Sequence, residues 1–397
     1  MTNGQQTLLL FAVDGVLLHA GGYKEALRRA VDHFGEQMGQ SSLDLSNGEI
    51  AAFEACGITN EWDSLPMCVG ALLNAAVAER PDLARPTVAE TIQTIDAAHI
   101  SIQRPDFSHI AERVRDHYQS GPITVSVHTV LKKAQPPDAQ HLIDELFRDV
   151  YDIRSVTTTV FQTLTLGHNR FHQTYGFPPA FEVDSTLLSF DRASISPDRV
   201  EAVMTAVDQK QLQAVIYTAR PSLPPIDLSD ADIPHLQRGR YSPEAELGVE
   251  LVGFAGKLPI VAAGRMAWLA DQNGGHVADY VKPAAVQALA AIGSALSGQE
   301  EAALAAAQHL TTDNELTGPL LALREGQTRV IVFEDSTGGI RGVREAAQRL
   351  RALGLNVTDE AVGVAPEASK RDALNPVADR VVDSINDGLM DILDGLK

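Results

Sequence analysis

Three short runs of apolar residues predict strands, and each run meets polar residues at its carboxyl end. The first run, 7–17, is cut off by Asp14-Gly15, so it predicts a strand whose last residues open into a turn. The other runs cover 212–217 and 329–333 and end at Thr218 and Glu334-Asp335. Such runs are typical of strands that are buried on both faces of a parallel sheet. Ligands of these sheets bind beyond the carboxyl ends of the strands. The pattern therefore predicts that the polar residues meet at one edge of one sheet.

Between the first and second runs, the apolar spacing changes to that of amphipathic helices. Apolar residues recur at i, i+3 and i+4, and prolines separate successive segments of this kind. We expect helices over 23–34, 47–56, 64–79, 87–98, 106–118 and 138–150, with further helices between 80 and 175. The sequence thus predicts a large, mostly helical insertion after the first strand.

The rest of the chain alternates helical and strand patterns. Helices are expected from Ser196-Pro197 to 207, over 284–309, after Gly338-Gly339 as far as 351, and over 386–393, with weaker strands over 361–364 and 380–382. Residues 222–275 are rich in Pro, Gly and Asp and have one apolar run at 258–263. They are interpreted as an elaborated connection without an assigned task. Together these patterns predict an α/β protein with a Rossmann-like parallel sheet.

Length and charge restrict the possible partners and location. The chain has 397 residues, which is usual for two domains, and a formal net charge of −20. This charge disfavours nucleic acid and anionic membranes as partners, because both attract basic surfaces. The first apolar run has no basic segment before it and is too short for a signal sequence or a membrane span. We therefore expect a soluble cytoplasmic protein.

Cysteine and histidine usage adds little chemistry. Cys56 and Cys68 lie on a predicted helical stretch, so we expect free thiols in a reducing compartment and no structural disulfide. His168 and His172 have the i, i+4 spacing of half a zinc site. No third ligand is evident nearby in the sequence, so both are interpreted as surface histidines.

The segment Phe11-Ala12-Val13-Asp14-Gly15 resembles the first signature of the haloacid-dehalogenase (HAD) superfamily, which reads aspartate, any residue, aspartate, glycine. The resemblance implies a Rossmann-like core over 1–20 and 185–397 and an α-helical C1-type cap over 21–184. It also implies activity like that of phosphoglycolate phosphatases and related enzymes, which hydrolyse small phosphate esters with Mg²⁺. Ala12 stands at the position of the family's first aspartate, the covalent nucleophile.

The same resemblance assigns roles to residues near the predicted strand ends. Asp14 matches the family's general acid and base, which protonates the leaving group and then activates water. Thr218 matches the hydroxyl that binds the phosphoryl group, and Lys282 matches the cation that neutralises it. Arg220 is a candidate for substrate binding, and an ordinary ion pair explains it equally well.

Glu334 and Asp335 are adjacent carboxylates, the oxygen ligands that Mg²⁺ prefers. In the family, this pair holds the ion together with the nucleophile and a main-chain oxygen, which Asp14 would supply here. Because Ala12 removes only one ligand, we expect weakened rather than abolished Mg²⁺ binding. The alternative is an acidic turn that caps the following helix.

Ala12 offers a methyl group where the family forms an aspartyl-phosphate. Asp14 is a poor replacement, since it begins two residues further along, about 6–7 Å at the rise of a strand. The alanine is either a natural loss, which would make the protein a pseudoenzyme, or a deliberate change that traps a bound ligand. We favour a phosphatase-type parent that has lost only its nucleophile, because the other matching residues are intact.

One polar segment of the predicted cap is a candidate for substrate contact. Asn60, Glu61 and Trp62 resemble the loop that some caps lower onto the core. The same residues also fit a helix N-terminus that is capped by Thr59 or Asn60, with Trp62 packed against the helices. Both interpretations remain open at this level.

Two functions follow from the sequence. The first is a Mg²⁺-dependent phosphohydrolase scaffold for a small phosphorylated metabolite, which is inactive with Ala12 in place. The second is a pseudophosphatase that binds a phosphorylated ligand or a protein partner without turnover. Dehalogenases use the same first aspartate, and phosphonatases need a cap lysine that is not evident here, so both are disfavoured. A homodimer is compatible with the sequence.

Overall fold

The computed structural model describes residues 5–228 and 241–396, which form two compact units. The sheet unit comprises Met1–Ala20 and Asp191–Lys397, and the helical unit comprises Gly21–Phe190. The sequence placed the second boundary after residue 184. In the structure α10 (Thr186–Phe190) still belongs to the helical unit, because it packs against α1 (Gly22–Gln37). A Cβ on Gly22 would lie 2.6 Å from the Cα of Leu187, so this close packing requires glycine.

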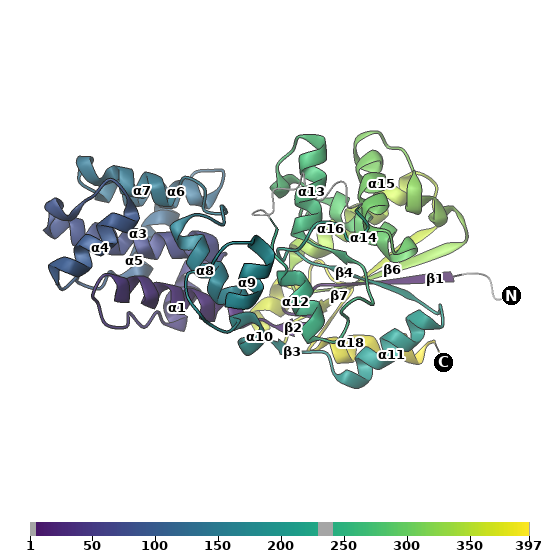
Figure 1. Cartoon of the computed structure of the whole chain (residues 1–397). Coiled ribbons are helices and arrows are strands. Elements are labelled where there is room, and N and C mark those ends of the chain that lie inside the picture. The colour runs from purple at the N-terminus through teal and green to yellow at the C-terminus, as the bar shows by residue number, and fades with distance from the viewer. Residues whose placement is uncertain (1–4, 229–240, 397) are drawn as a thin grey trace. The chain divides into compact units, whose positions relative to one another are not determined.

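A six-stranded parallel sheet forms the centre of the sheet unit (Figure 1). Its order is β5 (Ile260–Val261), β4 (Gln213–Tyr217), β1 (Gln5–Phe11), β6 (Gln327–Glu334), β7 (Val357–Val364) and β8 (Arg380–Val382). Phe11 pairs with Ile216 on one side and with Phe333 on the other, so the three central strands end at nearly the same level. The predicted Rossmann-like α/β fold is confirmed. A short antiparallel ribbon joins β2 (Leu18–His19) to β3 (Arg192–Ala193).

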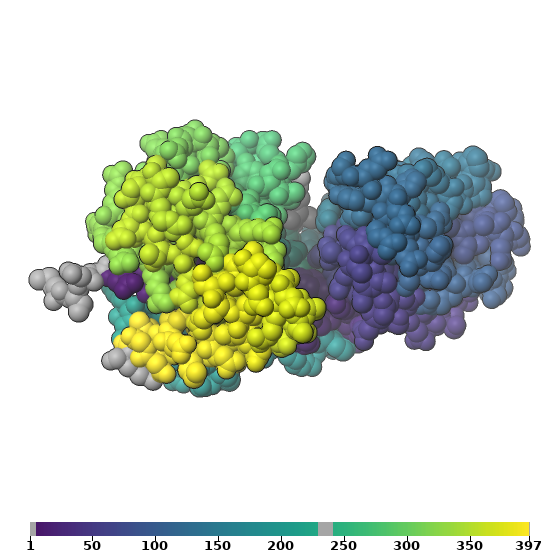
Figure 2. Space-filling model, turned by 180° about the vertical axis from the view of Figure 1, so that it is seen from behind, coloured from purple at the N-terminus to yellow at the C-terminus, as the bar shows by residue number. Residues whose placement is uncertain are grey.

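Alternate residues of β1 face the two helical layers that cover the sheet. Leu8 and Leu10 belong to one buried cluster, whereas Leu9 and Phe11 belong to the other. The first layer contains α13 (Ala263–Asn273), α14 (Ala285–Ser297), α15 (Glu300–Thr312), α16 (Thr337–Ala352) and α17 (Ala368–Leu374), with the 3₁₀ turns η5 (Val277–Asp279) and η6 (Gly318–Arg324). The second layer contains α11 (Pro197–Asp208), α12 (Glu244–Leu251) and α18 (Ile385–Asp394). Figure 2 shows, in yellow, the surface that the C-terminal segments give this unit.

Two elements differ from the sequence-based expectation. The stretch 284–309 forms two helices, because Gly298 ends α14 with a φ of +72° that favours glycine. The connection over 222–275 contains α12, β5 and α13, so the apolar run at 258–263 includes an edge strand. Residues 229–240 of that connection lie outside the described residues. The first strand ends at Phe11 and a turn follows it, as the sequence predicted for the run 7–17.

The helical unit has its own apolar core, as the spacing of its sequence predicted. After α1 it contains α2 (Asn47–Ala55), α3 (Glu61–Glu79), η1 (Pro81–Leu83), α4 (Val88–Ala98), α5 (Phe107–His117), α6 (Ile123–Ala134), η2 (Pro137–Ala139), α7 (Gln140–Leu146), α8 (Val156–Leu166) and α9 (His168–Tyr175). The buried residues of α1, α3 and α8 contribute much of this core. Over the described residues, none of the helices combines the length and apolar character that crossing a membrane requires.

Candidate functional site

The turn after β1 lies directly against the acidic residues that end β6. The main-chain N–H of Ala12 donates to the carbonyl of Phe333 at 3.0 Å, which extends the pairing of the two strands by one bond. Gly15 follows with a φ of +70° and donates to the carbonyl of Leu18 at 2.9 Å. A Cβ on Gly15 would collide with the Asp335 carboxylate. Glycine is therefore needed here both for the backbone conformation and for the close approach of Asp335.

Arg220 connects Asp14 to Asp191, a residue that the sequence did not single out. Its Nε lies 3.0 and 2.9 Å from the two carboxylate oxygens of Asp14, and its Nη2 lies 2.5 Å from Oδ1. The same Nη2 donates to Oδ2 of Asp191 at 2.8 Å. The side chains of Arg220 and Asp191 are only 1% and 2% exposed, whereas that of Asp14 is 39% exposed. The structure shows the ion pair that was one interpretation of Arg220; its contact with Asp191 is buried, whereas Asp14 is partly exposed.

Thr218 directly follows β4 and lies two residues before Arg220 in the chain. It is buried, and its Oγ1 accepts from the main-chain N–H of Arg220 at 3.3 Å. Its own N–H donates to the carbonyl of Val261 at 3.2 Å, which pairs it with the end of β5. The hydroxyl thus lies at the edge of the sheet where Asp14 is held.

Lys282 binds the first carboxylate of the acidic pair. Its Nζ forms an ion pair with Oε1 of Glu334 and lies 4.1 Å from the ring centroid of Tyr217. The other oxygen of Glu334 accepts from the main-chain N–H of Ser336 at 3.0 Å and from its hydroxyl at 2.8 Å. Burial and the charge of Glu334 raise the pKa of Tyr217 well above its usual value, so the ring stays neutral beneath the ammonium group. Both oxygens of Glu334 therefore have partners.

Asp335 is the carboxylate under electrostatic strain in this group. Its Oδ2 accepts from Nζ of Lys370 at 2.7 Å. Burial, followed by the neighbouring charge of Glu334, raises the pKa of Asp335, while Lys370 and Lys282 oppose the shift. The charged form of Asp335 is thus less favourable here than in water.

The contacts close a ring around the edge of the sheet. Thr218 contacts Arg220, Arg220 holds Asp14, the Gly15 turn touches Asp335, and Glu334 binds Lys282. The side chain of Gln287 completes the ring, because it bonds to the main chain of both Lys282 and Thr218. The structure therefore brings together every residue that the sequence selected in the sheet unit. The sequence missed the polar partners Asp191, Gln287 and Lys370.

These residues include oxygen ligands that suit a divalent cation but do not form a complete set. The carboxylates of Asp14 and Glu334 face Arg220 and Lys282, and the side chain at position 12 has no oxygen. Within 5–228 and 241–396, no three His, Cys, Asp or Glu side chains are grouped as a metal site. The strained Asp335 carboxylate, next to the Gly15 turn, is the ligand that fits best. The donor chemistry suits a hard cation such as Mg²⁺, which this incomplete set would hold more weakly than a full carboxylate site does.

The candidate residues of the predicted cap form their own cluster in the helical unit. Asn60 caps α3 by accepting from the N–H of Asp63 at 2.9 Å, and it donates to the Asp63 carboxylate at 2.7 Å. Glu61 is the first residue of α3. The Trp62 ring lies 5.0 Å from the Phe161 ring. Capping by Asn60 and packing of Trp62 are confirmed, and substrate contact by these residues stays a prediction.

Asp63 is buried in this cluster, and its surroundings disfavour the charged carboxylate. Burial raises the pKa of Asp63, and hydrogen bonds from Thr124 and Asn60 partly oppose the shift. Thr124 donates to the second carboxylate oxygen at 2.5 Å. Burial, with the charge of Asp63, also raises the pKa of Tyr151 to about 12. The segment that the sequence selected thus contains a polar network, with Asp63 as its centre.

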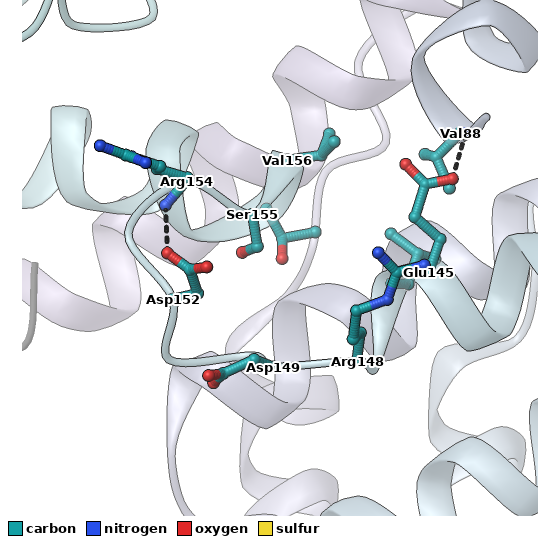
Figure 3. A pocket seen from close by; sticks show the side chains of 10 residues that line it. Val88, Glu145, Arg148, Asp149, Asp152, Arg154, Ser155 and Val156 are labelled. Atoms are coloured by element: carbon teal, nitrogen blue, oxygen red, sulfur yellow. Dashed lines mark hydrogen bonds between the residues drawn. The ribbon is translucent and has the colours of Figure 1, made fainter.

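A separate pocket of about 190 Å³ lies elsewhere in the helical unit (Figure 3). Charged residues of both signs line it, and Glu145 accepts from the N–H of Val88 at 2.9 Å. None of the residues selected from the sequence lines this pocket. His168 and His172 have their Nδ1 atoms at 2.8 and 3.1 Å from the carbonyls of Val183 and Phe177, so both are engaged by the backbone.

We expect Asp335→Asn to raise the thermal midpoint at neutral pH in the absence of Mg²⁺, by a few degrees at most. The folded-state pKa of Asp335 lies above its unfolded value, so the stability contribution of this residue falls as pH rises through that interval. Below the ordinary Asp pKa of about 3.9, both states are protonated and the gain should vanish. Thermal melts at the two pH values measure this difference.

Lys370→Ala is the control for this prediction. It leaves the carboxylate but removes the cation that favours its charged form, so the midpoint at neutral pH should fall. An equal loss of stability for Asp335→Asn at both pH values would contradict the strain that we assign to this carboxylate.

Comparisons with known proteins support the fold and assign no activity to the chain. No protein-family model matches the chain, and no curated protein matches it in sequence. The chain is similar in structure to an X-ray structure of a Northeast Structural Genomics Consortium target, with a TM-score of 0.63 and 14% sequence identity. The match covers 99% of this chain and 100% of the other. At this identity the likeness shows that the two chains share a fold.

Proposed function

We propose that the chain is a HAD-type, Mg²⁺-dependent phosphohydrolase scaffold for a small phosphorylated metabolite, inactive as it stands because position 12 is alanine. The observation that carries this proposal is the closed ring of contacts at the ends of β1, β4 and β6. It contains Asp14, Thr218, Lys282 and Asp335, which match the family's site residues one by one. Four such matches from distant parts of the chain would rarely meet at one sheet edge by chance.

The roles follow from the surroundings of each side chain. The Thr218 hydroxyl, at the end of β4, would donate to a phosphoryl oxygen. Lys282 would offer its ammonium group to the same phosphoryl group while Glu334 holds it in place. Asp14 would protonate the leaving oxygen and then take a proton from water. Arg220 orients Asp14 through two nitrogens, so in this proposal it is a positioning residue rather than a substrate ligand.

Asp335, Glu334 and the main-chain oxygen of Asp14 would hold Mg²⁺. When bound, the ion would supply positive charge beside the phosphoryl group. Asp335 would exchange its contact with Lys370 for the ion, which relieves the unfavourable burial of its charge.

The missing step is the formation of a covalent intermediate. A carboxylate at position 12 would attack phosphorus and form an aspartyl-phosphate, while the ester oxygen leaves with a proton from Asp14. Water, deprotonated by Asp14, would then cleave the acyl phosphate and release inorganic phosphate. The methyl group of Ala12 has no electron pair for this attack. The proposal is tested by phosphate release from Ala12→Asp on a panel of phosphate esters with Mg²⁺.

A second candidate function is phosphate-ligand binding without turnover. It is favoured by the Lys282–Glu334 ion pair and by the buried position of Thr218. Neither feature depends on a carboxylate at position 12. Such a protein would bind a phosphorylated metabolite, or a partner protein that carries phosphate, and would use the helical unit as a cap.

We expect inorganic phosphate with Mg²⁺ to raise the thermal midpoint of the unaltered protein. Binding to the native state alone adds about 2.7 kcal/mol at 100 times Kd, which corresponds to several degrees for a domain of this size. Lys282→Ala should remove this shift, whereas Lys132→Ala in the helical unit should leave it unchanged. A shift of equal size in Lys282→Ala would rule out the proposed anion site.

The cellular setting belongs to the same proposal. A net charge of −20 agrees with a small anionic metabolite that is bound through a few placed cations, and disfavours nucleic acid and membrane surfaces. Buried free thiols at Cys56 and Cys68 agree with a reducing cytoplasm. A homodimer is compatible with these features, and sedimentation measures it directly.

A further inference from the structure

A buried glutamine on α14 joins three separate segments at the edge of the sheet. The side chain of Gln287 is fully buried. Its Nε2 donates to the carbonyl of Thr218 at 2.7 Å and lies 3.2 Å from the carbonyl of Val261. Its Oε1 accepts from the main-chain N–H of Lys282 at 2.8 Å. One amide therefore connects the ends of β4 and β5 with the segment that carries Lys282.

Gln287 stands out from the composition of its helix. The other buried residues of α14 are almost all apolar or glycine, and Ser294 is the second polar one. The N-cap residue, Ala284, makes no side-chain hydrogen bond, so the first turn lacks an ordinary cap. A buried amide is costly unless its groups are paired. Here both ends of the amide are paired with main-chain groups next to the site.

These hydrogen bonds fix the main-chain position of Lys282, from which its side chain extends. The ammonium group lies between the ring of Tyr217 on β4 and the carboxylate of Glu334 on β6. Its ammonium group could reach other positions if the main chain moved, because the four-carbon side chain of lysine is flexible. Gln287 prevents this movement, since it ties Lys282 to the carbonyl of Thr218 through a single rigid amide.

We propose that Gln287 is a positioning residue, which holds the Lys282 ammonium group in line with the Thr218 hydroxyl so that both meet one phosphoryl group. The inference rests on the proposed function for the phosphoryl group, but the placement of Lys282 can be measured without any ligand. Gln287 touches neither substrate nor metal in this proposal. It acts through Lys282 and the end of β4.

The first experiment measures the position of Lys282 directly. Lysines are reductively methylated with ¹³C, which keeps their charge, and the Lys282 signal is assigned as the one that Lys282→Arg lacks. Because Nζ lies 4.1 Å from the Tyr217 ring centroid, this signal should be shifted upfield by the ring current. Gln287→Met, of similar volume, should move it toward the signals of solvent-exposed lysines.

Two further variants separate positioning from stability. Leu289→Ala, in the core face of the same helix, should lower the thermal midpoint and leave the Lys282 signal in place. Gln287→Glu keeps an acceptor for the Lys282 N–H but loses the donor to Thr218. It breaks the link from Lys282 to the end of β4, so it should reduce the upfield shift as well as destabilise the protein. If Gln287→Met leaves the Lys282 signal unmoved, the proposal is overturned.

The second experiment measures turnover in the Ala12→Asp background. Gln287→Met should lower kcat about 10- to 100-fold, as loss of a supporting hydrogen bond typically does. In a Lys282→Ala background the same change should cause no further fall, because the two residues act through one group. Additive losses would show a separate structural role for Gln287 and overturn the proposal. An inert Ala12→Asp protein with the expected Lys282 signals would instead refute the phosphatase function and leave the positioning of Lys282 intact.

Discussion

Under the proposed function, Ala12→Asp is expected to give the protein Mg²⁺-dependent phosphatase activity, with phosphate release rising by several powers of ten. Loss of a catalytic nucleophile commonly costs up to about 10⁶-fold in kcat, so its return should give a gain of similar order. The residues that would assist it are already assembled, since Asp14 is held by Arg220 and Lys282 by Glu334. The measurement is steady-state phosphate release with and without Mg²⁺.

Ala12→Asn is the matched control for this change. It has the shape of aspartate but a neutral amide, which does not attack phosphorus, so it should remain inert. Lys282→Ala in the Ala12→Asp background should remove most of the activity. Failure of Ala12→Asp to release phosphate from any ester of a broad panel, while still folded, would end the enzyme hypothesis and leave the binding hypothesis to be judged by thermal shift.

The largest expected loss of stability comes from Glu300→Gln, which breaks a buried ion pair that is not part of the candidate site. Arg265 has no exposed surface, and its Nε donates to Glu300 at 2.9 Å. Glu300 also accepts from the N–H groups of Ile260 at 2.8 Å and Ile226 at 3.1 Å. The amide would leave the buried arginine with the carboxylate of Glu246 and the carbonyl of Leu223. It would also place an amide N–H against a main-chain N–H that the carboxylate now accepts from. The free energy of unfolding should fall by about 3–5 kcal/mol, as measured by urea denaturation.

An exposed pair on α16 provides the comparison. Arg349 contacts Glu345 at 2.9 Å on the helix surface, and Glu345→Gln should cost less than about 1 kcal/mol. If the two changes cost equally little, the Arg265–Glu300 pair does not hold α13, α15 and β5 together as the contacts indicate. Since Ile260 belongs to β5, unfolding of that edge strand should accompany the loss, and hydrogen exchange of its N–H groups detects it.

Local patterns were sufficient for most elements. Apolar runs located β1, β4 and β6, and period-3.6 spacing located α1 and most of the helical unit. The errors arose where the local signal was weak. β5 has only two residues, and Gly298 divides a stretch whose composition is helical on both sides. Short edge strands depend on pairing with a neighbour, which no single segment encodes.

The partners of the site residues show most clearly what local sequence patterns do not predict. Asp191 lies 29 residues before Arg220 in sequence and has no pattern around it, yet it holds the arginine that holds Asp14. Lys370 lies 35 residues after Asp335 in an ordinary charged segment. Gln287 did leave a signal, since it is a polar residue inside an apolar helix. That signal indicated a buried amide but not the carbonyls that it binds.

By itself, the sequence determined the α/β class, the helical insertion and the residues that end the central strands, because hydrophobic spacing and turn residues act over a few neighbouring positions. The tertiary structure decided which charges are paired. It made Arg220 the partner of Asp14 and Asp191, and it placed Lys282 against Glu334 and Gln287. Ion pairs form between residues that are distant in the chain, and their energies depend on separation and burial, which exist only once the sheet has brought its strand ends together.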